Sequence, residues 1–312
     1  MNLSEAVSLY ISHKRALGYH YRSEADLFRA FCKAIGNKPI NSINTEAVMS
    51  FIKVDGVVTP YGVKKYYGLS GFYRFALTRD LVKVSPMPDT IAKPSTPPFV
   101  PYIYSHEEIK RLLDGIPAIC TNRVHIDAEV LRVLILLLYS TGVRLGEALS
   151  LTINEVCLQD SYLRINNTKF FKTRMVPFGN DLTLLLTTYI TQYRGYHAES
   201  SEAPLFCFQN GEALSHSATQ NAFRRMRQQA NVQRQDNSSY QPRLHDFRHT
   251  AAVHRLIEWY RKGKDLQILL PKLAIYLGHV DLSSTKHYLS MTPELLQEAS
   301  RRFENYAIGG GS

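Results

Sequence analysis

The chain has 312 residues, of which 45% are hydrophobic and 21% charged, and its formal net charge is +10. This length allows two domains, and the composition is that of a globular protein rather than a disordered one. The longest apolar run, Val133–Leu138, is too short to span a membrane and predicts a buried helix. The first residues lack the pattern of a signal peptide, so we expect a cytoplasmic protein.

Basic residues exceed acidic ones on both sides of Pro101. The part before it holds 13 Lys and Arg against 7 Asp and Glu, and the remainder holds 24 against 20. This balance favours a polyanionic partner such as nucleic acid. The alternative is that mild basicity serves only solubility, and charge alone does not separate the two.

Four segments in the first part of the chain show the helical spacing of apolar residues. In the last of them, for example, Val63, Phe72 and Ala76 fall on one broad face of a helix. The pattern predicts a small bundle with helices over Ser4–Leu17, Ser23–Ile35, Asn44–Ile52 and Thr59–Arg79.

A proline-rich stretch separates this bundle from the rest. Six of the 14 prolines lie between Pro86 and Pro101. Proline removes backbone donors and restricts the preceding residue, so neither a helix nor a central strand is expected here. The sequence therefore predicts a first domain over residues 1–85, a linker over 86–104 and a second domain over 105–312.

The second domain is predicted to be mainly helical with one small antiparallel sheet. Ser105 followed by Glu107 and Glu108 is typical of a helix start. Short alternating runs over Tyr162–Asn166 and Arg174–Phe178 indicate a hairpin. Helical spacing recurs over Asp127–Ser140, Gly146–Leu151, Asp181–Tyr193, Ser217–Asn231, His245–Tyr260 and Pro271–Leu277. The four cysteines form no Cys-x-x-Cys pair, so we expect buried free thiols rather than a zinc site or disulfides.

Two guanidinium groups, two imidazoles and a phenol follow one another in the second domain. Arg144 comes first, His245 and Arg248 are three residues apart, and His279 precedes Tyr288 by nine residues. Guanidinium groups offer forked donors to phosphate oxygens, imidazoles move protons near neutral pH, and a tyrosine hydroxyl can act as a nucleophile. The set indicates phosphodiester chemistry.

In this order and spacing, these residues resemble those of the tyrosine recombinases of the phage integrase family. The resemblance covers about Ser105 to Tyr306 well and the N-terminal helices loosely. It implies a mainly α fold, in which an N-terminal helical core-binding bundle of SAM-like type precedes a mixed α/β catalytic domain with a small antiparallel sheet. It also implies a site-specific recombinase that cuts and rejoins DNA through a 3′-phosphotyrosyl intermediate, without cofactor or metal ion.

The resemblance also assigns roles. Tyr288 is the expected nucleophile, and His245 the expected acceptor of its proton. The two arginines are expected to clamp the phosphate, His279 to donate a hydrogen bond to it, and Glu147 to orient Arg144 or a neighbouring group. The implied catalytic set is Arg144, Lys169, His245, Arg248, His279 and Tyr288, with Glu147 in support.

The general acid is expected on the hairpin. Aligning residues 168–177 with the family pattern Gly-Lys-Gly-x-Lys-x-Arg-x-Val-Pro places Lys169 at the catalytic position. Because Thr168 and Phe170 replace two glycines of that pattern, the turn is expected to be stiffer than usual. Lys172 stays an alternative.

Other basic residues are candidates for DNA contacts, although a solvated face explains each of them as well. They are Lys64, Lys65, Arg74, Lys172, Arg174, Arg224, Arg225 and Arg227. The family implies double-stranded DNA with short inverted core sites as substrate, and four protomers on two duplexes, alone or with a second related recombinase. Leu295, Leu296 and Phe303 fall on one stripe of a predicted C-terminal helix, which would dock in trans or in cis.

The biological role has several readings. The stretch from Arg248 to His279 is longer than in Xer-type resolvases, which favours a recombinase of a transposon or other mobile element acting on nucleoid DNA. A Xer-type resolvase of chromosome or plasmid dimers is the alternative. A type IB topoisomerase would use the same residues without strand exchange, and a non-catalytic DNA-binding module would lack the reacting groups.

Overall fold

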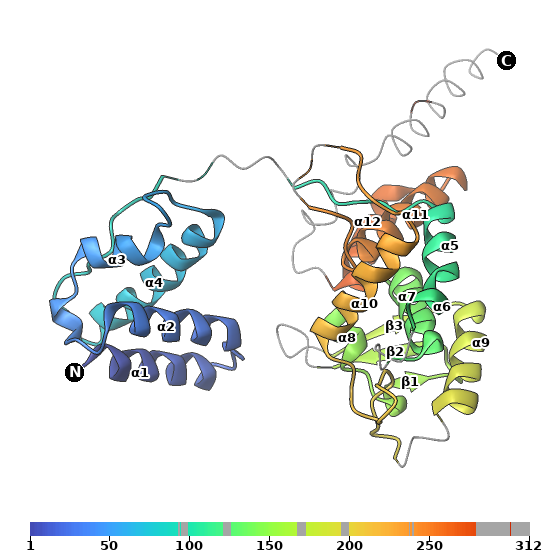
Figure 1. Cartoon of the computed structure of the whole chain (residues 1–312), viewed down its shortest axis with the longest axis horizontal. Coiled ribbons are helices and arrows are strands. Elements are labelled where there is room, and N and C mark those ends of the chain that lie inside the picture. Colours follow the sequence, from blue (N-terminus) through green and yellow to red (C-terminus); the bar gives the residue numbers. More distant parts are fainter. Residues whose placement is uncertain are drawn as a thin grey trace. The chain divides into compact units, whose positions relative to one another are not determined.

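The computed structural model describes residues 1–92, 94, 99–120, 126–166, 173–194, 200–236, 238, 240–278 and 300. The chain divides into two compact units, Met1–Pro98 and Phe99–Ser312 (Figure 1). The boundary falls inside the stretch for which the sequence predicts a linker. No helix among the described residues is both long and apolar enough to cross a membrane.

The first unit is a bundle of four α-helices, and each begins and ends within two residues of its predicted range. Local capping explains this agreement. The Asn44 side chain accepts from the backbone N–H of Ala47, and the Thr59 hydroxyl accepts from that of Gly62. The helices are α1 (Leu3–Ala16), α2 (Arg22–Ile35), α3 (Thr45–Ile52) and α4 (Pro60–Thr78), with a 3₁₀ turn at Ile40–Ser42.

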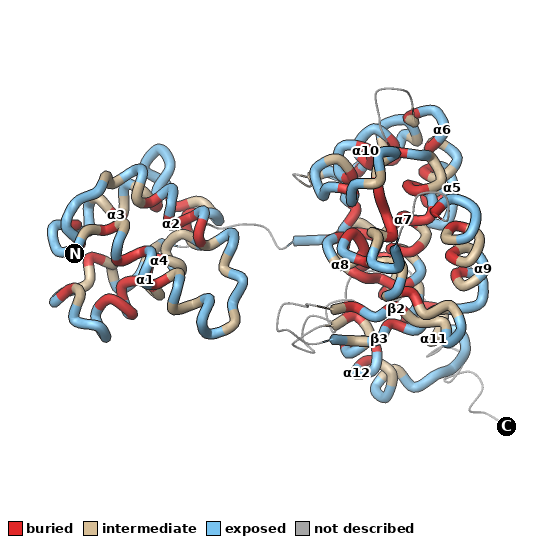
Figure 2. Tube along the Cα trace, turned by 90° about the horizontal axis from the view of Figure 1, so that it is seen from below, coloured by how far each residue is buried: buried red, intermediate tan, exposed pale blue. Residues whose placement is uncertain are grey.

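Aromatic rings fill the core of this bundle. Tyr10 meets Phe28 and Phe72 edge-on, at ring-centroid distances of 5.5 and 5.6 Å. Gly62 lets α4 approach α3 closely, because a Cβ there would lie 2.7 Å from the carbonyl oxygen of Ile52. Figure 2 shows the buried residues concentrated where the helices face one another.

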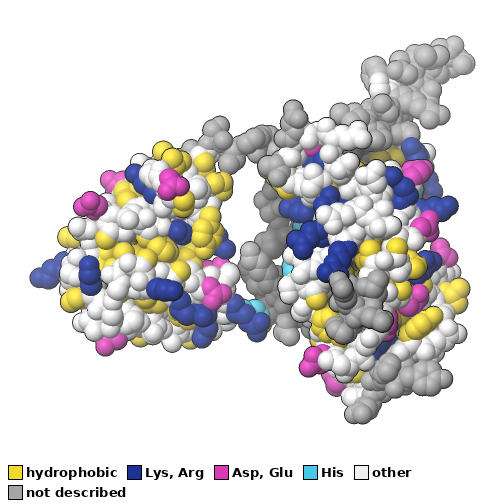
Figure 3. All heavy atoms as spheres, in the orientation of Figure 1, with side chains coloured by type: hydrophobic (Ala, Val, Ile, Leu, Met, Phe, Trp, Pro, Cys, Tyr) yellow, Lys and Arg dark blue, Asp and Glu magenta, His cyan; other side chains and the backbone are white. Residues whose placement is uncertain are grey.

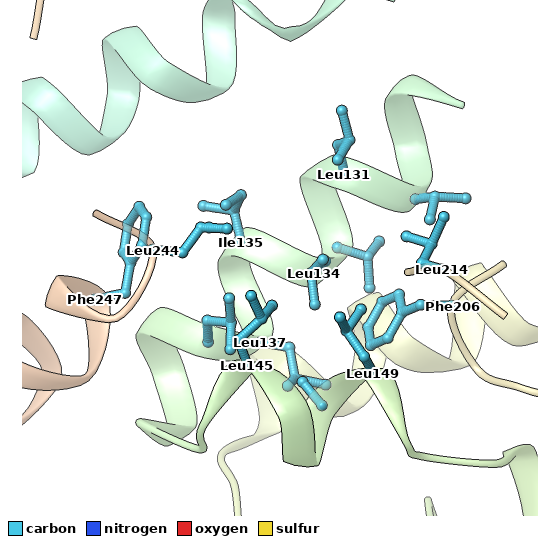
Figure 4. Close-up of a cluster of buried hydrophobic side chains, with 14 of the residues drawn as sticks. Leu131, Leu134, Ile135, Leu137, Leu145, Leu149, Phe206, Leu214, Leu244 and Phe247 are labelled. Carbon is cyan, nitrogen blue, oxygen red and sulfur yellow. The ribbon is translucent and has the colours of Figure 1, made fainter. Parts of the chain in front are cut away.

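The second unit is built around helix α7 (Ala128–Thr141). The predicted apolar run lies in it, and Leu134 and Leu137 are fully buried. Side chains from other elements, including Phe206 and Phe247, converge on α7 (Figure 4). The other α-helices among the described residues of this unit are α5 (His106–Asp114), α6 (Ile116–Ile119), α8 (Leu145–Leu149), α9 (Asn180–Thr188), α10 (His216–Gln229), α11 (Asp246–Arg261) and α12 (Leu266–Leu277).

The predicted hairpin is present as two strands of a three-stranded antiparallel sheet. Strand β2 (Tyr162–Ile165) pairs with β3 (Arg174–Pro177), with Leu163 opposite Val176 and Ile165 opposite Arg174. The third strand, β1 (Val156–Cys157), pairs with the other side of β2 and was not predicted. Its two residues are too few to show an alternating pattern.

Three expectations need correction. Helix α12 begins at Leu266 rather than Pro271, because Asp265 caps it by accepting from the backbone N–H of Gln267. The proline lies inside the helix and removes one backbone hydrogen bond. Helix α9 gives way to a π-helical turn at Tyr189–Arg194. Of the four cysteines, only Cys207 is buried, and the other three are partly exposed.

Candidate active site

The junction between α7 and α8 positions the first predicted arginine. Helix α7 ends at Gly142, which has a left-handed φ of 62° and so turns the chain sharply. Arg144 then caps the N-terminus of α8, and its backbone N–H donates to Oε2 of Glu147 at 2.8 Å. The Arg144 side chain is 40% exposed and can meet a ligand from solvent.

Glu147 is a partly buried carboxylate held by two arginines. Its Oε1 accepts from Nη1 of Arg144 at 2.9 Å, and its two oxygens accept from Nη1 and Nη2 of Arg174 at 2.9 and 2.8 Å. Burial alone would raise the pKa of Glu147. The hydrogen bonds from the Arg174 side chain and the Arg144 backbone outweigh burial and lower this pKa to about 2, so the carboxylate stays charged.

Arg248 lies on α11 and is 3% exposed. Its Nη1 donates to the carbonyl oxygen of Gly142 at 2.7 Å, and its Nη2 donates to that of Leu277 at 2.5 Å. A buried guanidinium requires such acceptors, since an unsatisfied donor would be costly. Arg248 therefore ties α11 to the C-terminal ends of both α7 and α12.

The end of α12 is the meeting point of these side chains. Gly278 caps the helix with a left-handed φ of 69°. Its carbonyl oxygen accepts from Nη2 of Arg144 at 3.1 Å, and the preceding carbonyl, of Leu277, accepts from Arg248. The two predicted clamp arginines thus bind successive carbonyl groups directly before His279.

His245 occupies the N-cap position of α11. The backbone there is fixed by Asp246 and by aromatic packing. Asp246 is fully buried and accepts from the backbone N–H of Arg243 at 2.8 Å, while the ring of Phe247 stacks on Tyr104 at 4.5 Å. His245 is exposed, but the protein around its ring still removes part of the water that would solvate the charged form. This desolvation, together with the nearby positive charge of Arg248, lowers the pKa of His245. The imidazole is therefore neutral at neutral pH.

The structure brings together Arg144, Glu147 and Arg248, and it places His245 one turn before Arg248 on the same segment. Other predicted residues, Lys169, Lys172, His279 and Tyr288, lie outside the described residues. Strands β2 and β3 bracket the segment that contains both lysines. No cluster of three or more His, Cys, Asp and Glu side chains suited to a metal ion occurs in the described part of the chain.

Several candidate DNA contacts are engaged within the protein. The ammonium group of Lys65 donates to the carbonyl oxygen of Phe51 at 2.7 Å, at the C-terminal end of α3, and lies over the Phe51 ring. Arg227 donates to the Val232 carbonyl at 3.3 Å and the Gln241 side chain at 2.9 Å. Both contacts stabilise the fold.

Other candidates are open to solvent. Arg225 is exposed on α10, and Arg224 is exposed while donating to Asn221 at 2.9 Å. Lys64 and Arg74 are exposed on α4. Figure 3 shows Lys and Arg side chains over both units, with a group on the larger unit in the area of α10. The exposure of these side chains leaves them accessible to a phosphate.

Two features of the site were not predicted from sequence. The carbonyl groups of Gly142, Leu277 and Gly278 carry no side-chain signal, because any residue provides a carbonyl. The pairing of Arg174 with Glu147 joins residues 27 positions apart. Only the resemblance to the family, which singles out both positions, could have suggested it.

Known proteins resemble this chain in sequence. Residues 104–294 match the model of the Phage integrase family. The chain is 34% identical over 309 residues to a protein of Sinorhizobium fredii named as an integrase/recombinase (y4rB), with 96% of each chain covered. It is 26% identical to the tyrosine recombinase XerD of Corynebacterium glutamicum over 290 residues, with 90% of each chain covered.

Solved structures share the fold. The integrase of transposon Tn1549, in complex with a circular intermediate DNA, aligns with a TM-score of 0.67 at 17% identity and covers 97% of this chain and 99% of its own. A lambda integrase dimer bound to a core site aligns with a TM-score of 0.64 at 16% identity and covers 91% of this chain and 97% of its own. The family model matches most of the second unit, in which predicted residues gather around the end of α12. The chain therefore belongs to the phage integrase family of tyrosine recombinases, which are DNA strand-transferases.

Proposed function

We propose that this protein is a site-specific recombinase that breaks and rejoins DNA through a covalent bond to Tyr288. The observation that carries the proposal is the convergence of Arg144 and Arg248 on successive carbonyl groups at the end of α12. Two guanidinium groups held at one place in the fold, one open to solvent and one buried, suit the charge that develops on a phosphate during transfer.

The proposed step is a transesterification. The hydroxyl oxygen of Tyr288 attacks the phosphorus, a 3′-phosphotyrosyl bond forms, and the bond from phosphorus to the 5′ oxygen breaks. The tyrosine proton passes to His245, and the departing 5′ oxygen takes a proton from Lys169, or from Lys172 as the alternative. Reversal of the step with a 5′ hydroxyl from another strand completes the exchange and restores both groups.

The lowering of the His245 pKa supports its part in this step. Desolvation and the charge of Arg248 keep the imidazole neutral, and only a neutral imidazole can accept the tyrosine proton. Arg144 and Arg248 are proposed to hold the non-bridging oxygens, and His279 to add a hydrogen bond to the same phosphate. The chemistry needs no cofactor.

For the assembly, we propose that four copies act on two duplexes that carry short inverted core sites. The solved lambda integrase structures include a dimer on a core site and a tetramer on a Holliday junction. In this chain a cavity of about 1140 Å³ lies among α5, α7, α11 and α12, lined in part by Tyr139, Ala251 and Leu273. It would receive the apolar stripe of a neighbour's C-terminal helix.

For the biological role, we propose a recombinase of a mobile element that acts on nucleoid DNA in the cytoplasm. The higher identity to the integrase/recombinase of S. fredii than to the Xer proteins supports this role. A Xer-type dimer resolvase is the second candidate, and the similarity to XerD over 90% of the chain favours it.

A recombination assay tests the proposal against its rivals. Duplexes that bind the full chain would be selected from a random library, and the preferred site placed twice in a supercoiled plasmid. A site-specific recombinase yields deletion or inversion products that depend on both sites. Relaxation of a plasmid without the site would indicate a topoisomerase, and binding without any covalent product would indicate a DNA-binding module.

A further inference from the structure

Arg174, the first residue of β3, faces Glu147 rather than solvent. Its two terminal nitrogens donate to the two carboxylate oxygens at 2.9 and 2.8 Å. The side chains of Arg174 and Glu147 are only 13% and 11% exposed. This is the two-pronged geometry that makes arginine pairs with carboxylates both strong and directional.

The same carboxylate also sets the position of Arg144. Glu147 accepts from the Arg144 backbone at 2.8 Å and from its guanidinium at 2.9 Å. Four hydrogen bonds therefore converge on one carboxylate, two from each arginine. Without Arg174, the carboxylate would keep only the bonds from Arg144 and could rotate, so the direction of the Arg144 guanidinium would no longer be set.

Arg174 also touches the end of α12. A Cβ placed on Gly278 would lie 3.0 Å from Cζ and Nη1 of Arg174, so the guanidinium packs directly against this glycine. Gly278 in turn accepts from Nη2 of Arg144 at 3.1 Å. One side chain on β3 thus contacts both the carboxylate on α8 and the backbone that leads into His279.

We propose that Arg174 is a positioning residue, which acts through Glu147 and Gly278 to hold Arg144 at the phosphate, and that it is not a DNA contact. The inference rests on the proposed function of Arg144. It differs from the sequence-based expectation, under which Arg174 belonged with the residues that contact phosphates. Both terminal nitrogens of Arg174 already donate to the Glu147 carboxylate, and only 13% of the Arg174 side chain is exposed, against 40% for Arg144.

The test compares Arg174→Gln with Arg164→Gln. Arg164 is exposed on β2, opposite Met175, and its loss removes one charge from the same sheet. Affinity for the selected duplex is measured as a function of salt, and single-turnover cleavage is measured at saturating DNA. A positioning role predicts that Arg174→Gln changes the affinity by no more than about twofold and leaves the salt slope unchanged, while cleavage falls about 100-fold, the typical cost of misplacing a reacting group. Arg164→Gln should leave cleavage unchanged.

A double mutant shows whether Arg174 acts through Arg144. Once Arg144→Ala has removed the clamp, adding Arg174→Gln should slow cleavage by no more than about threefold, because residues in one network are not additive. A further loss near 100-fold would mean that Arg174 acts independently. A salt slope reduced by about one, with normal cleavage at saturation, would make Arg174 a phosphate contact.

Arg174→Lys covers the case in which Arg174→Gln does not fold. The lysine keeps the charge but cannot bond both carboxylate oxygens in the same way. A positioning role predicts that Arg174→Lys binds the duplex with normal affinity and cleaves it more slowly than wild type, whereas normal cleavage would overturn it. A wild-type chain that forms no covalent complex would instead overturn the function proposed for the whole site.

Discussion

Arg144 and Arg248 have different surroundings, although the sequence assigns them the same role. Arg144 is partly exposed, whereas Arg248 is buried between the carbonyl groups of Gly142 and Leu277. A lysine in either place loses the forked donor geometry, so both Arg144→Lys and Arg248→Lys should slow cleavage about 10²- to 10³-fold.

Only the buried arginine should matter for stability. Arg248→Lys leaves a buried carbonyl group without a donor, which typically costs about 1–3 kcal/mol in the free energy of unfolding. Arg144→Lys should change this free energy by less than about 1 kcal/mol, because the pair with Glu147 is partly exposed. Urea denaturation of the two variants measures the contrast, and equal destabilisation would contradict it.

The pH dependence of cleavage should report the state of His245. A proton acceptor must be neutral, and the pKa of His245 lies below its ordinary value because the ring is desolvated and near Arg248. The cleavage rate should therefore hold as pH falls through about 6.5, the ordinary histidine pKa, and decline only below it. A single-turnover profile with its acidic midpoint above that value would remove His245 from this role. In the His245→Asn variant, this decline of the cleavage rate at acidic pH should be absent.

Glu147 should contribute acid-sensitive stability. Its folded-state pKa of about 2 is below the unfolded value, so the contribution is complete above about pH 4.3 and is lost as pH falls toward 2. At about 1.4 kcal/mol per pKa unit, it amounts to at most about 3 kcal/mol. The difference in unfolding free energy between wild type and Glu147→Gln should therefore shrink from pH 5 toward pH 2. A constant difference would show that Glu147 is not held as a charged group.

At the scale of single residues, the sequence pattern predicted side chains and not their backbone partners. Arg144 and Arg248 stand out because guanidinium groups in a spaced motif indicate phosphate chemistry. Their acceptors in the fold are backbone carbonyl groups at the ends of α7 and α12, and only the fold brings these ends to the two side chains. Arg174 was predicted as a candidate DNA contact, and its pairing with Glu147 depends on how the fold packs β3 against α8.

At the scale of elements, the ends of α7 and α12 pack against each other through a glycine. Gly142 has a left-handed φ of 62°, and a Cβ there would lie 2.8 Å from Cδ2 of Leu277. Gly142→Ala should destabilise the protein by about 1–3 kcal/mol, from backbone strain and from the displaced side chain.

Gly146 on α8 is a matched control for this change. Space around its Cβ position is open, and its φ is not left-handed. Gly146→Ala should therefore leave stability unchanged or raise it by up to about 1 kcal/mol, since alanine favours helix over glycine. Thermal unfolding of both variants tests the packing, and a stable Gly142→Ala would contradict it.

Elements with caps and long periodic faces were predicted well, and short or exceptional ones were not. Thr59 with Pro60 marks the start of α4, and Ser105 with Glu108 forms the capping box of α5. Pro271 suggested a helix start, whereas the actual cap is Asp265. The local cap decides where α12 begins, and the helix continues through Pro271 because a proline removes only one backbone hydrogen bond.

At the scale of the whole molecule, family and fold follow from motif order along the chain. Residues spread from Arg144 to Tyr288 share one chemistry only if the fold brings them together, and the second unit does so for Arg144, Glu147 and Arg248. Neither target site nor direction of recombination leaves such a pattern, since both depend on surfaces read against a particular DNA sequence.

The most direct measurement is covalent capture on a nicked suicide duplex built from the selected site. Wild-type protein should remain attached to the 3′ phosphate after denaturation, and mass spectrometry should place the adduct on Tyr288. Tyr288→Phe should bind the duplex with unchanged affinity and form no adduct, because the attacking oxygen is missing. An adduct that persists in Tyr288→Phe, or that maps to another residue in wild type, would contradict the proposed mechanism.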